Sequence, residues 1–302
     1  MTKIAITTTS FGKDDPSPLT LCREKGLEVV LNPYGRKLKT EELKELARGA
    51  TGLIAGTEAI TEDALLALRD LKVISRCGTG LDNVDLKAAE RLGIKVFNTP
   101  DAPTQAVAEL AVGLMLNLLR KVGRMDRAVR AGQWEKLMGN LLSEKTVGII
   151  GLGRIGGRVA ELLGCFGCKI KYYDRREGDL STAAQRVGLD ELFRTCDIIS
   201  VHVSSTERII ADSEIGSMKR GAWLINVSRG GVVCENALYD ALREGRLSGA
   251  AIDVFEVEPC SDRFKDLENI VLTPHIGSYA HEARVQMEML SVSNLLKGLE
   301  IE

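Results

Sequence analysis

The sequence predicts an α/β protein made of two doubly wound parallel sheets, and three observations support this prediction. Short β-branched segments alternate with amphipathic segments along almost the whole chain, a pattern typical of parallel strands joined by crossover helices. The length of 302 residues allows two domains at roughly 150 residues each. Residues 98–103, Asn-Thr-Pro-Asp-Ala-Pro, contain two prolines and separate one series of strands and helices from a second.

The first series contains five predicted strands with helices between them. The helical patterns at residues 40–47 and 61–68 each open with a threonine that an acidic residue soon follows, which is typical of a helix N-terminus. The strands are expected at residues 4–8, 28–31, 52–55, 72–75 and 95–97.

The second series begins with a long helical pattern at residues 104–122, whose apolar stripe is too broad for a helix with one exposed face. A final helical pattern covers residues 281–299. We place the domain boundary near residue 99 and predict that the chain returns to the first domain after residue 276. Spacing alone would also allow a tail on the second domain. The strands of this series are expected at residues 146–150, 169–173, 198–202, 223–227, 250–254 and 269–272.

Composition and charge disfavour several classes of protein. Hydrophobic residues make up 44% and charged residues 27% of the chain, which excludes broad disorder. The 40 Lys and Arg against 42 Asp and Glu leave a net charge of −2, so the overall charge does not favour nucleic acid or anionic lipid as a partner. The sequence contains no uninterrupted apolar run of about 18 residues, so it does not predict a membrane-spanning helix.

The N-terminal residues and the cysteines predict a cytoplasmic location. The start, MTKIAITTTS, has the pattern of a first strand and lacks the apolar core of a signal peptide. The seven cysteines are scattered, unlike those of a secreted disulfide scaffold. Cys165 and Cys168 form a CxxC for which reduced thiols are favoured over a redox pair, and no residue pattern predicts a metal site.

A glycine-rich turn in the second series predicts a dinucleotide site. The strand at 146–150 leads directly into Gly151-Leu152-Gly153-Arg154-Ile155-Gly156 and then into a helical pattern. Gly151 permits the tight turn, Gly153 lets a pyrophosphate reach the backbone, and Gly156 lets the helix pack on the strand. The helix N-terminus, with Arg154 and Ile155, supplies N–H groups and partial positive charge. A glycine turn without a ligand is the alternative.

The residue that ends the next strand predicts which dinucleotide binds. Asp174 lies 18 residues (174 − 156) past Gly156, where a carboxylate accepts hydrogen bonds from the ribose hydroxyls and repels a 2′-phosphate. This favours NAD over NADP. Arg175 and Arg176 follow directly and could turn toward a phosphate, so use of both cofactors stays open.

Three polar residues at strand ends predict the reaction. Arg229 follows one strand, Glu258 lies beyond the next, and His275 follows the last, and ligands of open parallel sheets bind at these carboxyl ends. Arginine captures a carboxylate bidentately, nicotinamide carries hydride, and histidine exchanges protons near neutral pH. A neighbouring carboxylate favours the imidazolium form. The set suits hydride exchange at a 2-hydroxy acid.

Structural roles are the alternatives for these side chains. Arg229 could be a member of a structural ion pair, and Glu258 could be a solvated loop acid. Of the other two histidines, His202 is expected to pack or to line the cofactor site, and His281 to cap the last helix or lie at the rim of the active site.

The glycine turn, the three strand-end residues and the motifs around them, in their order along the chain, resemble the D-2-hydroxyacid dehydrogenase family. The resemblance is strongest to its phosphoglycerate dehydrogenase branch. The resemblance implies that Arg229 anchors the substrate carboxylate and carbonyl, that Glu258 pairs with the proton donor and acceptor His275, and that Asp253 holds the nicotinamide amide. It covers essentially the whole chain and rests on RCGTGLDNVDLKAAE, NTPDAPTQAVAEL, GLGRIG, INVSRGG, AAIDVFEVEP and TPHIGS.

The resemblance also implies an architecture. A Rossmann cofactor domain at residues 99–276 is inserted into a flavodoxin-like substrate domain at residues 1–98 and 277–302, and the cofactor domain forms a homodimer. The chain is expected to lack the regulatory domain that senses serine in longer members. The family's usual Pro-Leu-Thr is replaced here by Val-Ser-Ser before Thr206, which keeps Thr206 as a predicted cofactor contact.

The loop at residues 76–80 resembles the family's substrate loop. The N–H groups of Gly78, Thr79 and Gly80 would form an anion nest for the substrate carboxylate, with a plain strand-to-helix turn as the alternative. Arg76 matches one basic residue of members that act on 3-phosphoglycerate, but residues 54–58 lack the second arginine. A lost charge-assisted hydrogen bond is worth roughly 1.5–3 kcal/mol. A lysine elsewhere, or Lys136 from a second subunit, could compensate.

These expectations give three candidate functions. The first is NAD-dependent interconversion of 3-phosphoglycerate and 3-phosphohydroxypyruvate, a step of serine biosynthesis. The second is reduction of glyoxylate or hydroxypyruvate, because a smaller substrate does not need the absent arginine. The third, from a different class, is a non-catalytic protein that senses NAD(H) on the same fold.

Overall fold

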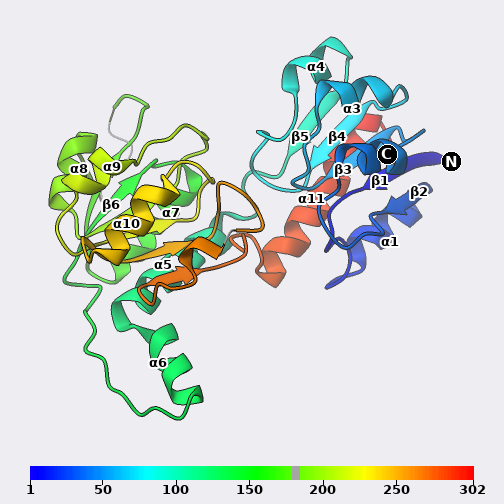
Figure 1. Ribbon diagram of the computed structural model, residues 1–302. Helices are drawn as coiled ribbons and strands as arrows, with labels where there is room; N and C mark the ends of the chain where they lie inside the picture. Colours follow the sequence, from blue (N-terminus) through cyan, green and yellow to red (C-terminus); the bar gives the residue numbers. More distant parts are fainter. Residues whose placement is uncertain (179–183, 261) are drawn as a thin grey trace. The chain divides into compact units, whose positions relative to one another are not determined.

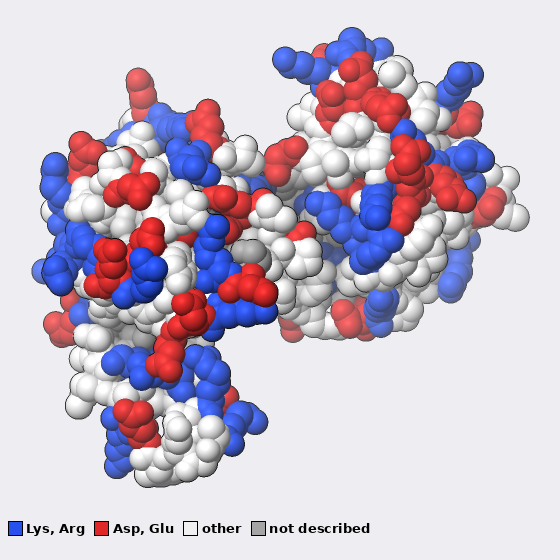
Figure 2. Space-filling model, viewed as in Figure 1, with Lys and Arg blue, Asp and Glu red and all other residues white. Residues whose placement is uncertain are grey.

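The computed structural model describes residues 1–178, 184–260 and 262–302. The contacts within the chain divide it into two compact units (Figure 1). The first unit comprises Met1–Pro103 and Ser278–Glu302, and the second comprises Thr104–Gly277. Acidic and basic side chains are interspersed on the visible face of each unit (Figure 2).

The first unit is built on a five-stranded parallel sheet. Its order, β2-β1-β3-β4-β5, is the doubly wound order of flavodoxin-like folds. The first strand lies two residues earlier than predicted, because Thr7 and Thr8 already belong to the loop that follows it. The strands are β1 Thr2–Ile6, β2 Leu27–Leu31, β3 Gly52–Ala55, β4 Val73–Arg76 and β5 Lys95–Asn98.

Helices cover this sheet, and the last helix of the chain is one of them. Leu295 and Val292 of α11 are fully buried in one apolar cluster with Ile4 and Ile6 of β1. The C-terminal helix therefore belongs to the first unit. The helices of this unit are α1 Ser17–Glu24, α2 Thr40–Leu46, α3 Glu62–Ala67, α4 Leu86–Arg91 and α11 His281–Leu299.

The second unit contains a parallel sheet of seven strands in the order β12-β11-β10-β9-β6-β7-β8. Counted from β6, this is the Rossmann order 3-2-1-4-5-6 with one further strand, so both doubly wound sheets are confirmed. The two-residue strand β8 was not predicted, because it is too short to produce a periodic pattern. The strands are β6 Thr146–Ile150, β7 Lys169–Tyr173, β8 Gln185–Arg186, β9 Ile198–Val201, β10 Ala222–Asn226, β11 Leu247–Ile252 and β12 Ile270–Leu272.

The long helix predicted at 104–122 is confirmed as α5, which ends two residues earlier than expected, and a further helix that was not predicted, α6, follows it. Lys121 adopts a left-handed φ of 53°, which ends α5, and α6 follows with none of its residues buried. The helices of this unit are α5 Thr104–Arg120, α6 Val122–Arg130, α7 Arg154–Cys165, α8 Leu189–Thr195, α9 Asp212–Ser217, α10 Glu235–Arg243 and the short 3₁₀ helix Asp262–Phe264. No described helix has the length and apolar character needed to span a bilayer.

The strand order of the second unit locates its ligand edge. The sheet grows in one direction from β6 through β7 and in the other through β9. Ligands of open α/β sheets bind at the carboxyl ends of the strands on either side of such a reversal. The glycine turn follows β6 directly, so it lies at this point.

We expect truncation of a buried side chain on α11 to destabilise the first unit. Leu295 is fully buried, and its Cδ1 lies only 2.9 Å from the position that a Cβ on Gly52 would take. Leu295→Ala should lower the free energy of unfolding by about 2–5 kcal/mol, measured by urea denaturation. Leu290→Ala, at a position 37% exposed on the same helix, is the control, and equal losses in the two variants would contradict this packing.

Candidate functional site

The glycine turn has the geometry needed to receive a pyrophosphate. Gly151 has a φ of +91°, which other residues rarely adopt, and a Cβ on Gly156 would lie 2.0 Å from the Gly151 carbonyl oxygen. A Cβ on Gly153, in contrast, would meet nothing within 4 Å. Gly151 and Gly156 are therefore required by the fold, whereas Gly153 opens the backbone toward space that a ligand can enter. Arg154 and Ile155 begin α7 directly behind it.

Asp174 is held against this turn. Its Oδ2 accepts a hydrogen bond of 2.8 Å from the Leu152 N–H, and its Oδ1 accepts bonds from the backbone N–H and Nε of Arg176. These contacts, the Arg176 side chain first, lower the pKa of Asp174 to about 2. The carboxylate therefore stays ionised at the end of β7, at the position predicted for ribose recognition.

The two arginines after Asp174 are both engaged with carboxylates. Arg176 pairs with Asp174 at 3.0 Å and also donates Nη2 to the Leu152 carbonyl oxygen. Arg175 pairs with Glu207 at 2.5 Å. The sequence did not predict that Arg176 orients Asp174, although the two residues lie only two positions apart. Thr206 lies in the loop after β9 and is exposed.

His202, at the end of β9, packs next to the turn. Its Nε2 lies 2.8 Å from Ser200 Oγ, and its carbonyl oxygen lies 2.9 Å from the place of a Cβ on Gly151. Burial of the ring lowers the pKa of His202 to about 4, so the ring is neutral near pH 7. This environment suits a packing residue rather than a proton donor.

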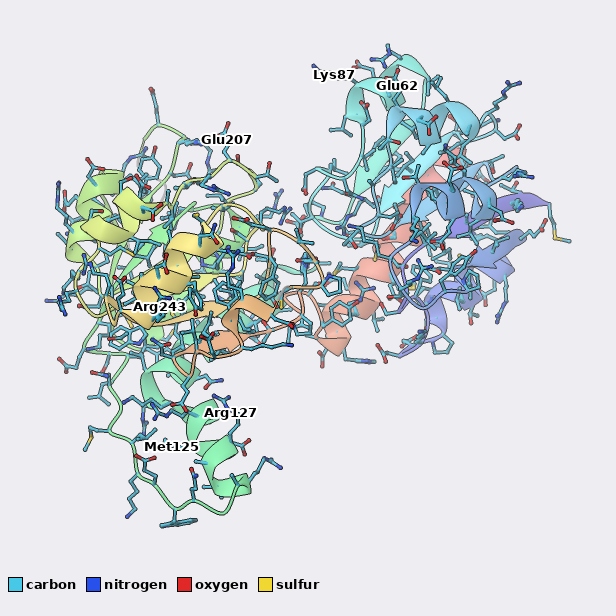
Figure 3. All side chains as sticks on the ribbon, viewed as in Figure 1. Glu62, Lys87, Met125, Arg127, Glu207 and Arg243 are labelled. Carbon is cyan, nitrogen blue, oxygen red and sulfur yellow. The ribbon has the colours of Figure 1, made fainter. Side chains whose placement is uncertain are left out.

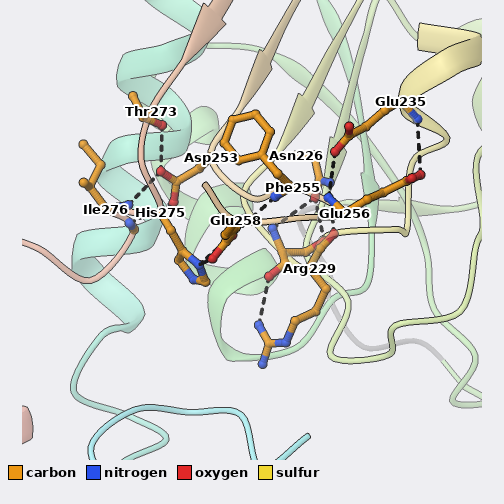
Figure 4. A network of polar contacts seen from close by, with 12 residues as sticks. Asn226, Arg229, Glu235, Asp253, Phe255, Glu256, Glu258, Thr273, His275 and Ile276 are labelled. Atoms are coloured by element: carbon orange, nitrogen blue, oxygen red, sulfur yellow. Dashed lines mark hydrogen bonds and ion pairs between the residues drawn. The ribbon is translucent and has the colours of Figure 1, made fainter. Parts of the chain in front are cut away.

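His275 and Glu258 form a hydrogen-bonded pair (Figure 4). His275 Nδ1 lies 3.0 Å from Glu258 Oε1 and 3.1 Å from Oε2, and both side chains are partly exposed. Glu258 is itself oriented by the Phe255 N–H. Because Nδ1 faces the carboxylate, Nε2 is the ring atom left to exchange a proton with a substrate.

Asp253 fixes the loop that carries His275. It is 1% exposed, and its carboxylate accepts hydrogen bonds from Thr273 Oγ1 at 2.6 Å, the Ile276 N–H at 2.8 Å and the Gly277 N–H at 2.9 Å. These donors lie on both sides of His275, which has a left-handed φ of 55°. The contact between Asp253 and a nicotinamide amide stays a prediction, and the role of Thr273 was not foreseen.

Arg229 lies on a neighbouring loop of the same sheet edge (Figure 4). It follows β10, and its Nη1 donates to the Ser228 carbonyl oxygen at 2.8 Å. A Cβ on Gly230 would lie 1.8 Å from the Phe255 carbonyl oxygen, so only glycine allows this loop to pack on the one that carries Glu258. The structure thus brings Arg229, Glu258 and His275 to adjoining loops of the second unit.

The loop predicted to bind the substrate lies in the first unit. Arg76 ends β4, donates Nη1 to the Cys77 carbonyl oxygen and lies over Gly78. The Gly78 N–H donates to Thr99 Oγ1 at 2.8 Å, and the anion nest that includes Gly78 stays a prediction. The contributions of Thr79 and Gly80 remain predictions.

The titratable side chains of the described residues do not assemble into a metal centre. Within the described ranges, no three His, Cys, Asp or Glu side chains gather closely enough to hold a metal ion. Cys165, which is exposed, and Cys168, which is partly buried, are both free thiols.

We expect Asp174→Ala to weaken the discrimination against NADP. The substitution removes the carboxylate that a 2′-phosphate would face and releases Arg176 from its ion pair. The ratio of kcat/KM for NADH to that for NADPH should fall about tenfold to a hundredfold, the range of one charge-assisted hydrogen bond of roughly 1.5–3 kcal/mol. Glu144→Ala, which removes an exposed acid of the same unit, is the control. A ratio that stays fixed in Asp174→Ala would show that Asp174 does not select the cofactor.

Comparisons with known proteins identify relatives of this chain. A family model described as "D-isomer specific 2-hydroxyacid dehydrogenase, NAD binding domain" matches residues 112–277. The chain is 40% identical over 298 residues to a hydroxypyruvate reductase of Thermotoga maritima, covering 95% of this chain and 96% of that protein. It is 39% identical over 280 residues to the D-3-phosphoglycerate dehydrogenase of Homo sapiens, covering 89% of this chain and 52% of that protein.

This chain therefore spans about half the length of the human relative. Among solved structures, the TT0316 protein from Thermus thermophilus superposes with a TM-score of 0.90 at 35% identity, covering 99% of this chain and 97% of that one. The likeness thus extends over both units, beyond the residues that the family model matches.

Proposed function

Because the chain belongs to the D-isomer specific 2-hydroxyacid dehydrogenase family, we propose that Arg229, Glu258 and His275 carry out hydride exchange between NAD and C2 of a small 2-hydroxy acid. The observation that carries this proposal is the 3.0 Å contact between His275 Nδ1 and Glu258 Oε1, on a loop adjoining that of Arg229. This arrangement supplies a proton donor, its partner and a carboxylate anchor.

The proposed roles follow from the chemistry of each group. Bound NADH supplies the hydride. In the reductive direction, the Arg229 guanidinium binds the carboxylate of the 2-keto acid, and His275 Nε2 gives its proton to the oxygen on C2. Glu258 stabilises the protonated imidazole and holds its orientation. Asp253 and Thr206 are proposed to contact the cofactor. The loop with Arg76, Gly78, Thr79 and Gly80 is proposed to contact the substrate.

We expect His275→Ala to lower kcat by about a hundredfold or more, because proton transfer by a positioned side chain contributes at least that factor. Binding of NADH, followed by its fluorescence, should be largely retained, because the glycine turn and Asp174 are untouched. Turnover equal to that of the unsubstituted enzyme would exclude His275 as the proton donor. Tight NADH binding by the unsubstituted protein, without turnover of any candidate keto acid, would favour the sensor of NAD(H).

We consider two candidate substrates for this reaction. The sequence predicts 3-phosphoglycerate, and Arg76 and the likeness to a phosphoglycerate dehydrogenase support it; the reaction would then serve serine biosynthesis. Hydroxypyruvate or glyoxylate is the second candidate. The loop after β3 carries Glu58 and no arginine, and this observation favours the second candidate.

We also propose a homodimer formed through the second unit. Helix α6 has no buried residue, and the side chains of Met125 and Arg127 project from it (Figure 3). In the segment after α6, Trp134 is 83% exposed and Met138 is 87% exposed. Trp134 and Met138 thus give this segment a surface with large exposed apolar side chains, which is typical of a protein–protein interface.

We expect the double variant Trp134→Ser, Met138→Ser to shift the protein from dimer toward monomer, because it removes the two most exposed large side chains of that surface. Mass measured by light scattering after size-exclusion chromatography reports the change. Phe166→Ser, which alters an exposed apolar side chain after α7, should leave the mass unchanged. A monomeric unsubstituted protein, or an unaltered mass in the double variant, would contradict the proposed interface.

A further inference from the structure

A buried carboxyl group lies where neighbouring strands of the first unit end. Glu58 follows β3 by three residues (58 − 55) and is 2% exposed. Its Oε1 accepts a hydrogen bond from Thr7 Oγ1, at the end of the adjacent strand β1, and another from the Gly56 N–H at 3.1 Å. Glu58 therefore joins the carboxyl ends of β1 and β3.

Within the part of the chain that the structure describes, this carboxyl group has no cationic partner. Among the described residues, no Lys, Arg or His nitrogen lies within 4.0 Å of Glu58, although buried acids in proteins are nearly always paired with a cation. Both of its hydrogen bonds within the described chain end on Oε1. The other oxygen, Oε2, thus keeps its capacity to accept a hydrogen bond.

Thr8 lies close to this carboxylate, and two buried hydroxyl groups in loops of the first unit lack a hydrogen-bond partner within the described chain. A Cβ on Gly56 would lie 2.9 Å from Glu58 Oε2 and 3.3 Å from Thr8 Cγ2, so the carboxylate and Thr8 both lie close to the Gly56 backbone. Thr8 Oγ1 is buried and lacks a hydrogen-bond partner within the described chain, and the same holds for Thr79 Oγ1 in the loop after β4.

The loop that carries Glu58 is tied to the loop at residues 76–80. Asn83 Nδ2 donates to the carbonyl oxygens of Gly56 at 3.2 Å and Glu58 at 2.7 Å, and the Cys77 N–H donates to the Ala55 carbonyl oxygen at 2.9 Å. Glu58 is therefore held beside the segment proposed to bind the substrate.

We propose that Glu58 is a specificity-determining residue that selects a substrate with a neutral hydroxyl on C3 and excludes one with a phosphate there. This inference rests on the proposed function of the 76–80 loop. A hydroxyl donates to Oε2 in a charge-assisted hydrogen bond, whereas a phosphate beside a carboxylate in this buried setting meets like-charge repulsion that water screens poorly. Glu58 thus favours hydroxypyruvate over 3-phosphohydroxypyruvate.

The test compares kcat/KM for these two keto acids, from NADH absorbance, in four proteins. The unsubstituted enzyme should prefer hydroxypyruvate by about tenfold or more. Glu58→Gln keeps an oxygen that can accept from Thr7 and Gly56 but removes the negative charge. It should therefore reduce the preference for hydroxypyruvate by about tenfold, because kcat/KM for 3-phosphohydroxypyruvate rises. Glu58→Asp keeps the charge and should retain the preference. Glu45→Gln, at an exposed acid of the same unit, should behave like the unsubstituted enzyme.

The outcomes separate this inference from the proposed function. An unsubstituted enzyme that uses 3-phosphohydroxypyruvate as well as hydroxypyruvate would overturn the role of Glu58, and so would a Glu58→Gln enzyme with an unchanged ratio. Absence of turnover with every keto acid would instead overturn the proposed reaction. Two measurements need only the unsubstituted enzyme: the ratio of kcat/KM for the two keto acids, and the inhibition by 3-phosphoglycerate relative to glycerate. They test whether the site excludes a phosphate even where Glu58→Gln fails to fold.

Discussion

The carboxylate of Asp253 is the interaction on which the arrangement of the site depends. Thr273, Ile276 and Gly277 all donate to it, so one buried acid fixes the backbone on both sides of His275. A left-handed residue between these donors has little freedom to change its direction. The His275–Glu258 contact is consequently a property of two anchored loops, rather than of two flexible side chains that happen to meet.

The cofactor half of the site is organised by a second carboxylate. Asp174, the residue proposed to bind the ribose, accepts hydrogen bonds from the Leu152 N–H inside the glycine turn and from the side chain of Arg176. It is therefore bonded directly to the backbone that is proposed to hold the pyrophosphate. The proposed recognition of the sugar and of the phosphates thus depends on one carboxylate held at the end of β7. Its low pKa keeps this group charged throughout the neutral range.

The fold could be predicted from sequence because parallel strands leave a simple pattern of buried segments and helices. The order of strands in each sheet confirms that pattern, and the three glycines of the turn have the separate environments that their spacing indicated. Contacts that depend on tertiary geometry could not be predicted. The left-handed Lys121 ends α5 close to the predicted end, but helix α6, which follows it, was not predicted.

The site shows the same division between pattern and geometry. Arg229, Glu258 and His275 could be proposed because they lie in the loops that follow three successive strands. The donation of the Gly78 N–H to Thr99 could not, because Thr99 lies 21 residues along the chain. The sequence showed only that residues 54–58 lack an arginine, and it predicted no role for Glu58. Its burial and its hydrogen bonds with Thr7 and Gly56 arise from the pairing of β1 with β3.

The two ends of the second unit lie side by side. A Cβ on Gly277, its last residue, would lie 3.3 Å from Val107 Cγ2, in the first turn of the helix that begins it. Entry and exit of the polypeptide are thus neighbours, and the intervening 104–277 segment has its own hydrophobic interior. A domain whose ends lie close together can be inserted into a loop of another domain without separating the strands on either side of the insertion point.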